Sequence, residues 1–156
     1  METIKIGIVD DHKLVSKALE NLISFNVNFR VTMNCFNGQD FMDQLRTTTD
    51  HPDVVLMDIN MPIKNGIEAT QEVSKEFPNI KVIALTMEDN ETTIIRMLKA
   101  GAKGYLLKDM SPDILFDAID IVHKQGTFYT DLLTQSLLKI KTEEKLVQNL
   151  NDSFKS

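Results

Sequence analysis

The stretch "VVLMDINMPIKNG", residues 54–66, decides how this chain is organised. Four apolar residues lead straight into Asp58, and a Met-Pro pair and an Asn-Gly pair follow at once. A short apolar run bounded by turn residues is typical of a strand whose two faces are both covered. The loop after it should turn sharply at Pro62, and Gly66 is free to adopt a positive φ. We therefore expect a buried strand that delivers one carboxylate to the edge of a sheet.

Similar apolar runs recur along the chain and alternate with amphipathic stretches. The apolar runs predict strands over residues 4–11, 29–36, 53–58, 80–86 and 103–108. The stretches between and after them predict helices over residues 12–25, 38–48, 66–77, 90–101 and 111–126. Because strands rich in Val, Ile and Leu alternate with helices, we predict an α/β fold with a doubly wound, five-stranded parallel sheet.

Single residues predict where several helices begin, where they end and which face is buried. Gly101 and Gly126 are typical C-terminal stops. Ser111 and Pro112 are typical of a helix cap and a first helical position. In the first helix, apolar residues at helical spacing predict the buried face, which is made of Leu14, Ala18, Leu22 and Phe25.

Composition limits the classes of protein to which the chain can belong. Its 156 residues suit one domain with an appendage, and 42% hydrophobic residues suffice for one core. The net charge of −6 disfavours direct binding to nucleic acid, because phosphate contacts need a basic face. The single cysteine, Cys35, allows no internal disulfide and suits a reducing compartment. Without a signal-peptide pattern or a membrane-length apolar run, we expect a cytoplasmic protein with no membrane contact.

The α/β pattern is complete at about residue 126, so we expect one domain over 1–126 and a helical tail or linker over 127–156. In the tail, Thr130 is a suitable cap for a helix over roughly 131–150. An isolated helix of this length is marginal in water, so its apolar stripe should pack on something. The candidates are the same domain, a further domain and a second copy of the chain. The stripe consists of Leu133, Leu137, Ile140, Val147, Asn151 and Phe154.

Charged and hydroxyl residues stand at the carboxyl ends of the predicted strands. In a doubly wound sheet these ends meet at one edge, which is where ligands bind. Three carboxylates at one edge repel one another and need a counter-ion, and Mg²⁺ prefers oxygen ligands. The sequence therefore predicts a magnesium site at this edge. The strand-end residues are Asp10, Asp11, Asp58, Thr86 and Lys108.

A carboxylate held beside such a cation can act as a nucleophile in phosphoryl transfer. We expect Asp58 to form an acyl phosphate and Asn60 to offer its backbone carbonyl to the metal. The Lys108 ammonium would neutralise charge on the phosphoryl oxygens, and the Thr86 hydroxyl would hydrogen-bond to one of them. Each residue alone is more often a turn residue or a solvated charge. Together at one edge, they predict a site that accepts a phosphoryl group.

These residues resemble the receiver domain of two-component response regulators over residues 4–126. The segment "LTMEDNETTIIRMLKAGAKGYLLKD" is most similar to the LuxR/NarL-type subfamily of transcription factors. The motifs that carry the resemblance are "IVDDH" with Asp10 and Asp11, "LMDINMP" with Asp58, "ALTMED" with Thr86, and "GAKGYLLKD" with Lys108.

The resemblance implies a flavodoxin-like receiver fold with strand order 2-1-3-4-5. It also implies a sensor histidine kinase as the phosphoryl donor, and a second copy of the chain as a partner after phosphorylation. DNA would be contacted only through a C-terminal domain that is not in this chain. The residue roles that it implies are Asp58 as phosphoacceptor, Asp10 and Asp11 as the acidic pocket for Mg²⁺, Lys108 as a phosphoryl contact, Thr86 as the switch hydroxyl, and Tyr105 as the aromatic residue whose rotamer follows Thr86.

The chain departs from the family pattern in two places. Asp109 stands where many receivers have a proline, often after a cis bond, which leaves the Lys108–Asp109 bond open. LuxR/NarL-type proteins also continue into a helix-turn-helix domain, whereas this chain stops before one. It is therefore either a fragment of a DNA-binding regulator or a stand-alone receiver that acts through protein contacts.

Two other classes of protein fit the sequence less well. A haloacid-dehalogenase-type phosphatase also uses an Asp nucleophile and Mg²⁺, but it needs a second Asp where this chain has Asn60. A flavodoxin-type carrier needs an uncharged phosphate loop where this chain has Asp10 and Asp11. We therefore expect no enzyme activity beyond the chain's own phosphorylation and dephosphorylation. His12, directly after the acid pair, should lie at the pocket rim, as a helix-start residue or as one that tunes the pocket.

Overall fold

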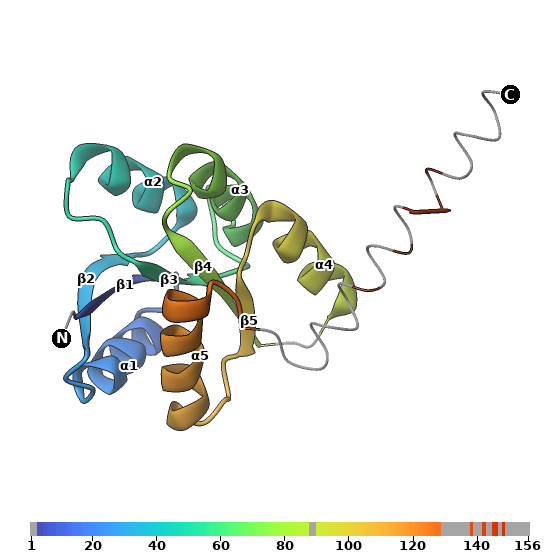
Figure 1. Cartoon of the computed structure of the whole chain (residues 1–156). Helices are drawn as coiled ribbons and strands as arrows, with labels where there is room; N and C mark the ends of the chain where they lie inside the picture. Colours follow the sequence, from blue (N-terminus) through green and yellow to red (C-terminus); the bar gives the residue numbers. More distant parts are fainter. Residues whose placement is uncertain are drawn as a thin grey trace, which may run out of the picture.

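The computed structural model describes residues 3–87 and 90–128, together with residues 138, 142, 145, 146 and 148. Strands and helices alternate along the chain, which confirms the predicted α/β class (Figure 1). The strands are β1 (Ile4–Val9), β2 (Phe29–Cys35), β3 (Val54–Asp58), β4 (Lys81–Thr86) and β5 (Gly104–Leu107). The helices are α1 (Lys13–Ser24), α2 (Gly38–Thr47), α3 (Gly66–Glu76), α4 (Glu91–Ala100) and α5 (Pro112–Gln125).

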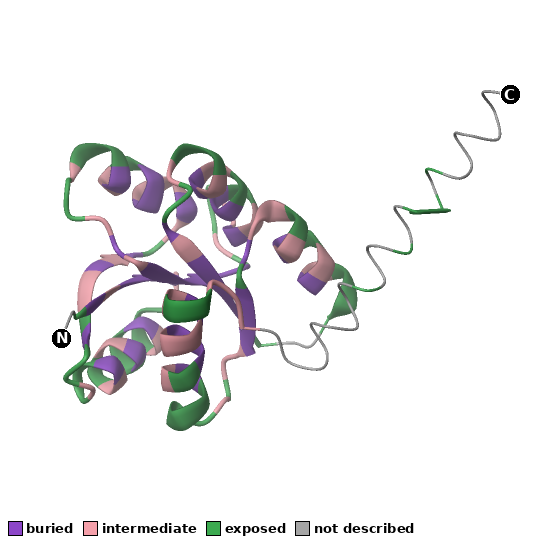
Figure 2. Ribbon diagram, in the orientation of Figure 1, coloured by how far each residue is buried: buried purple, intermediate pink, exposed green. Residues whose placement is uncertain are grey.

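The strands form one five-stranded parallel sheet in the order β2-β1-β3-β4-β5, as the family resemblance implied. Helices α2, α3 and α4 cover one face of the sheet, and α1 and α5 cover the other (Figure 1). Parallel neighbours require crossover connections, and these connections place the helices on the faces of the sheet. In Figure 2, buried residues (purple) accordingly lie mainly on the strands of the sheet and on parts of the helices, and exposed residues (green) lie on the outer sides of the helices.

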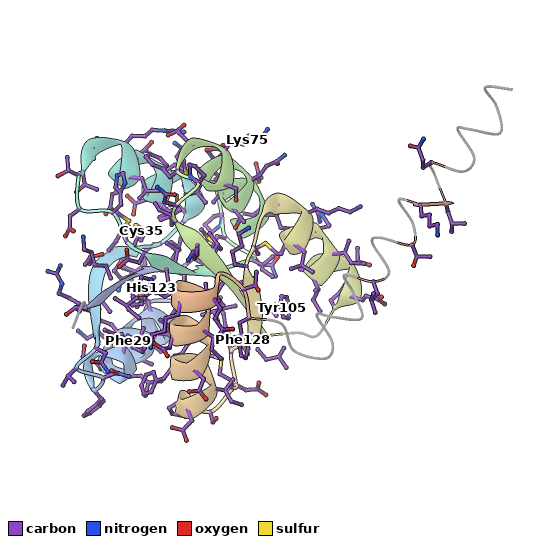
Figure 3. All side chains as sticks on the ribbon, in the orientation of Figure 1. Phe29, Cys35, Lys75, Tyr105, His123 and Phe128 are labelled. Carbon is purple, nitrogen blue, oxygen red and sulfur yellow. The ribbon has the colours of Figure 1, made fainter. Side chains whose placement is uncertain are left out.

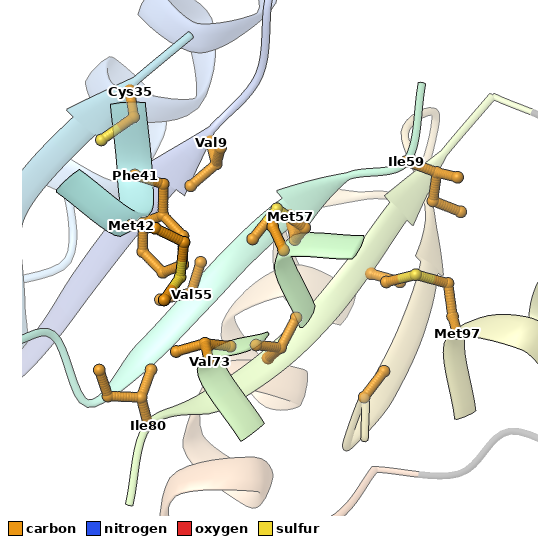
Figure 4. Packing of buried hydrophobic residues seen from close by; sticks show 14 of the residues in the cluster. Val9, Cys35, Phe41, Met42, Val55, Met57, Ile59, Val73, Ile80 and Met97 are labelled. Carbon is orange, nitrogen blue, oxygen red and sulfur yellow. The ribbon is translucent and has the colours of Figure 1, made fainter. Parts of the chain in front are cut away.

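The central strand β3 supplies both halves of the core. All five of its residues are buried, and successive side chains point to opposite faces. Val55 and Met57 pack against Phe41 and Val73 in the cluster on the α2–α4 side (Figure 4). Leu56 belongs to the cluster on the α1 and α5 side. The apolar run therefore continues without polar interruption because each residue meets a covered face.

The predicted buried face of α1 is wrong. Leu14 is 88% exposed and Phe25 is 84% exposed, whereas Ser16, Leu19 and Ile23 are the residues of α1 that are buried. A second stripe at helical spacing therefore faces the sheet. It includes a polar residue because the Ser16 hydroxyl donates to the side-chain oxygen of Asn34 at 2.6 Å. This long-range hydrogen bond satisfies the buried hydroxyl. Hydrophobic periodicity alone would assign a serine at this position to the solvent-facing side of the helix.

The predicted helix ends are largely confirmed. Gly101 and Gly126 follow α4 and α5 with φ values of 116° and 97°, the left-handed conformation that glycine tolerates best. Pro112 is the first residue of α5, as expected. Ser111 precedes it with extended backbone, but its side chain makes no capping hydrogen bond. Asn65 instead provides the complete capping box, at the start of α3.

The chain after α5 returns to the edge of the sheet. The backbone N–H of Phe128 donates to the carbonyl of Lys103 at 2.9 Å, and Phe128 forms an isolated parallel bridge with Gly104 (Figure 3). The predicted tail helix over 131–150 and the six residues of its apolar stripe lie outside the described residues. The division at residue 126 stays a prediction. None of the helices in the described part of the chain is long and apolar enough to cross a membrane.

Gly66 does not have the positive φ that its turn position predicted. Positive φ in the described part of the chain occurs at Gly101, Gly126 and Ile63, of which Ile63 (φ 69°) lies in the same loop. Gly66 is required for a different reason: a Cβ there would overlap the carbonyl oxygen of Asp58 and lie 2.9 Å from the Cα of Ile59. Its N–H donates to the Ile59 carbonyl at 2.8 Å. The missing side chain therefore lets α3 begin directly against the end of β3.

Replacing Gly66 with Ala should lower the free energy of unfolding by about 1–3 kcal/mol, because backbone atoms at the end of β3 must move to admit the methyl group. Urea unfolding measures the loss. Gly104→Ala is the matched control, since the nearest atom to its added Cβ lies at an ordinary 3.4 Å. Equal unfolding midpoints for the two variants would contradict the close approach at Gly66.

Candidate functional site

The structure brings the predicted strand-end residues to one edge of the sheet. Parallel pairing of Val9 with Met57, of Asp58 with Leu85 and of Thr86 with Leu107 aligns the carboxyl ends of neighbouring strands. The residues that follow these ends therefore converge. Asp10 and Asp11 follow β1, Asp58 ends β3, Thr86 ends β4, and Lys108 follows β5.

Lys108 is the positive group at this edge. Its Nζ lies 2.8 Å from Oδ2 of Asp10 and 3.1 Å from Oδ1 of Asp58. All three side chains are nearly inaccessible to solvent. The backbone N–H of Lys108 also donates to the carbonyl of Thr86 at 2.7 Å, which holds the start of the β5–α5 loop against the end of β4. The Lys108 ammonium group thus faces two buried carboxylates. A third acid, Asp11, directly follows Asp10 in the sequence.

The electrostatics of the pocket are set by burial and by like charge. Burial is the largest cause that raises the pKa of Asp58, and the negative charge of Asp10 adds to it. Lys108 opposes both effects, and together they leave the pKa of Asp58 at about 6 instead of 3.8. Burial alone would lower the pKa of Lys108, but its hydrogen bonds and ion pairs with Asp10 and Asp58 outweigh that effect and raise it. Lys108 is therefore positively charged at neutral pH, whereas the ionised form of Asp58 is less stable in the folded protein than in water.

The carboxylates fit a hard divalent cation. Oδ2 of Asp58 is buried and has no hydrogen-bond partner within the described ranges. A carboxylate oxygen can only accept, so a cation is the natural partner for an orphaned one beside other acids. Asp10, Asp11, His12 and Asp58 each offer one ligand atom, and these atoms lie within 4.8 Å of one another. Asn60, whose backbone carbonyl was predicted to join them, lines the same pocket.

Several pocket residues were missed or left open by the sequence. His12 lies at the rim, as predicted, and its backbone N–H donates to Asp10 Oδ1 at 2.9 Å. Asn90 and Thr93, at the start of α4, also line the pocket and were not predicted. Their sequence signal is a helix start, since the Asn90 side chain accepts from the N–H of Thr93 at 3.2 Å. Nothing in that signal says that this helix start faces Asp58.

The two residues of the predicted switch are both buried. Thr86 is 6% exposed at the end of β4, and Tyr105 is 4% exposed on β5, where it pairs with Ala84. The Tyr105 side chain belongs to the core cluster that includes Met97 of α4 (Figure 3). The Tyr105 ring therefore points into the core in this structure, and we call this arrangement inward. The Lys108–Asp109 bond, left open by the sequence, is trans.

The chain was compared with known proteins. The family model described as the response regulator receiver domain matches residues 6–120. The chain is 36% identical over 136 residues to the transcriptional regulatory protein DegU of Brevibacillus brevis, covering 87% of this chain and 57% of that protein. It is 33% identical over 156 residues to the oxygen regulatory protein NreC of Staphylococcus haemolyticus, covering 97% and 70%. The chain thus spans only part of the length of these relatives.

Solved structures agree with these matches. A two-component response regulator of the LuxR family from Aurantimonas sp. SI85-9A1 superposes with a TM-score of 0.78 at 27% identity, covering 90% of this chain and 99% of that one. A LuxR-family DNA-binding response regulator from Staphylococcus aureus superposes with a TM-score of 0.71 at 28% identity, covering 78% and 99%.

The raised pKa of Asp58 predicts how stability depends on pH. The native state holds the proton more tightly than the unfolded chain, so without divalent cations stability falls as pH rises from about 4 to about 6. Asp58→Asn removes the buried charge and should raise the free energy of unfolding above pH 6 by about 1–3 kcal/mol. The gain should shrink below about pH 5, where wild-type Asp58 is itself protonated.

Urea unfolding in the presence of a chelator, repeated across this pH range, measures the effect. Asp117→Asn, on the exposed face of α5, is the control and should change stability little at any pH. If Asp58→Asn is no more stable than wild type above about pH 7, the charge of Asp58 does not carry the cost described here.

Proposed function

This chain belongs to the response regulator receiver domain family, and we propose from its site that Asp58 accepts a phosphoryl group with the help of Mg²⁺. One observation carries the proposal. Asp58 is buried at the end of β3 with one oxygen on Lys108 and the other oxygen buried without a hydrogen-bond partner in the described ranges. Such a carboxylate is held in position, and no residue that the structure describes forms a hydrogen bond with its second oxygen. It is therefore arranged to react or to bind a cation rather than to stabilise a turn.

The reaction that this arrangement supports is an in-line transfer. A carboxylate oxygen of Asp58 attacks phosphorus, and the phosphorus–nitrogen bond of a phosphohistidine breaks as the new phosphorus–oxygen bond forms. The imidazole leaves with the electron pair and takes up a proton, and Asp58 becomes an acyl phosphate. Lys108 stays beside the reacting oxygens and neutralises charge on the phosphoryl group, while the Thr86 hydroxyl donates to a phosphoryl oxygen.

Mg²⁺, when bound, supplies positive charge that offsets the repulsion between the carboxylates and the incoming phosphoryl group. The residues that would hold it are Asp10, Asp11, Asp58 and the backbone carbonyl of Asn60. Asn60 stands where a phosphatase of the haloacid-dehalogenase type needs an acid, and an amide cannot give and regain a proton. The proposed chemistry is therefore limited to phosphorylation and dephosphorylation of the chain itself.

The proposed donor is a protein, a sensor histidine kinase. Met87, an apolar residue that lines the pocket, is 75% exposed. Met87 and Lys108 line both the carboxylate pocket and a mainly apolar groove along α1, which includes Ala18 and Leu22. The mainly apolar groove along α1 thus adjoins the pocket that holds the reactive carboxylate. A surface of this kind suits a protein donor better than a small phosphate ester.

The proposed output is control of transcription. The LuxR-type relatives regulate transcription, and this chain spans between 57% and 70% of the two described above. DNA would be contacted by a domain outside these 156 residues, because their net charge of −6 disfavours contacts with phosphates. Phosphorylation would favour pairing with a second copy of the chain. If the chain is a stand-alone receiver, phosphorylation would instead change the surface that binds a protein partner.

Incubation with acetyl phosphate and Mg²⁺ should add one phosphoryl group to the wild-type chain and none to Asp58→Asn, because the amide keeps the shape but lacks the nucleophile. Intact-mass measurement reports the addition. Asp109→Asn, at an exposed carboxylate next to Lys108, is the matched control and should be phosphorylated. A phosphoryl group on Asp58→Asn, or none on wild type, would refute the assignment.

The proposed switch joins Asp58 to the surface of α4, β5 and α5 through Thr86 and Tyr105. A phosphoryl group adds charge and acceptor oxygens beside Thr86, which moves to bind one of them. The space that Thr86 vacates is filled by the Tyr105 ring. The buried ring in this structure is the inward arrangement, so phosphorylation would raise the population of a packing that the fold already accommodates.

Beryllofluoride, a phosphoryl mimic, should change the amide signals of α4, β5 and α5 in wild type, because it stabilises the inward packing. Thr86→Ala should still bind the mimic but lose these distant changes, as it has no hydroxyl to move. Thr86→Ser keeps the hydroxyl and should keep them. Nitrogen–proton correlation spectra report all three. Undiminished distant changes in Thr86→Ala would show that the coupling bypasses Thr86.

A further inference from the structure

His12 lies against the acidic pocket but has no part in the phosphoryl transfer described above. Its ring Nδ1 is 3.2 Å from Oδ1 of Asp10 and 3.3 Å from Oδ1 of Asp11. The hydrogen bond from its backbone N–H to Asp10 holds the residue at the start of α1, so its imidazole faces the two acids. One ring nitrogen is thus aimed at the same carboxylates that are expected to hold a cation.

A second observation also points to a cation at this position. Oδ2 of Asp58 is buried and has no hydrogen-bond partner among the described residues, in a carboxylate that is only 5% exposed. Ligand atoms of Asp10, Asp11, His12 and Asp58 lie within 4.8 Å of one another, so one ion can be reached by all four. Lys108 supplies one positive charge against three carboxylates. The cluster therefore has a net negative charge, which favours binding of a divalent cation.

The nitrogen atom changes which dications the cluster prefers. Mg²⁺ is a hard cation that selects oxygen ligands. Neutral imidazole is a good ligand for Zn²⁺, Co²⁺ and Ni²⁺, whose affinity for nitrogen-containing sites exceeds that of harder ions. A carboxylate only accepts, so Nδ1 carries the ring proton when it hydrogen-bonds to Asp10. Nδ1 offers its lone pair to a cation once the proton is on Nε2 instead. Its side chain is 63% exposed, so ligation need not disrupt the packed core.

We propose that His12 is a nitrogen ligand that raises the preference of this pocket for a first-row transition-metal dication over Mg²⁺. The proposal rests on the proposed function for the carboxylate ligands and adds His12 to them. It gives the pocket two classes of metal ion, one held by oxygen atoms alone and one held by oxygen atoms and an imidazole nitrogen.

Calorimetric titration of the full chain with Co²⁺ and with Mg²⁺ tests the proposal. Any site favours Co²⁺ to some degree, so the informative quantity is the ratio of the two affinities in each variant. His12→Gln should lower the ratio of Co²⁺ to Mg²⁺ affinity by at least about tenfold relative to wild type. His123→Gln, on α5 (Figure 3), is the matched control and should leave the ratio unchanged.

Proton NMR of the Co²⁺ complex provides a direct readout of ligation. Wild type should show a strongly shifted, exchangeable proton from Nε2–H of a bound imidazole, and His12→Gln should not. An unchanged affinity ratio in His12→Gln, or a shifted proton that persists in it, overturns the role of His12. If wild type binds neither metal, the cation site itself is wrong and the proposed function fails with it. Binding of Mg²⁺ with an unchanged ratio refutes only the inference about His12.

Discussion

The buried contact of one ammonium with two carboxylates is the constraint on which the rest of this structure depends. Lys108 reaches both Asp10 and Asp58 at the carboxyl edge of the sheet. Without it, two buried negative charges would face each other with little solvent to screen them. Even with it, the pKa of Asp58 rises to about 6, so the protein tolerates the charge rather than fully stabilising it. This incomplete neutralisation of charge is what supports the proposal that the pocket binds a cation and accepts a phosphoryl group.

Much of the fold serves to hold that contact in place. The carbonyl of Thr86 accepts the backbone N–H of Lys108, so the ends of β4 and β5 fix where the ammonium starts. Asp58 is set by a strand whose residues are all buried, and Gly66 lets α3 begin against its carbonyl. A strand packed on both faces cannot shift to relieve the repulsion. The rigidity of the sheet is therefore what keeps a costly charge arrangement assembled.

The same constraint relates the site to regulation. The proposed phosphoryl group would change the charge balance beside Thr86, at the end of β4. Thr86 is one strand away from buried Tyr105. Close-packed layers respond to such a change by shifting between discrete arrangements, because they lack the free volume for a gradual rearrangement. The groove along α1 opens beside the same pocket. The proposed donor groove along α1 and the proposed output surface of α4, β5 and α5 thus both border one charged centre.

Sequence periodicity alone determined the alternation of strands and helices, because apolar runs and helical spacing are local consequences of burial. The strand-end acids could be predicted to meet, since parallel strands share an edge. Strand order came from family resemblance, because no local pattern says which strands are neighbours. Only the tertiary structure decided that α1 buries Ser16 rather than Leu14, since the Ser16 hydroxyl is satisfied by a residue on another element. It also decided why residue 66 is glycine and that His12 faces the acids, because both depend on close approaches between segments whose relative positions no local pattern specifies.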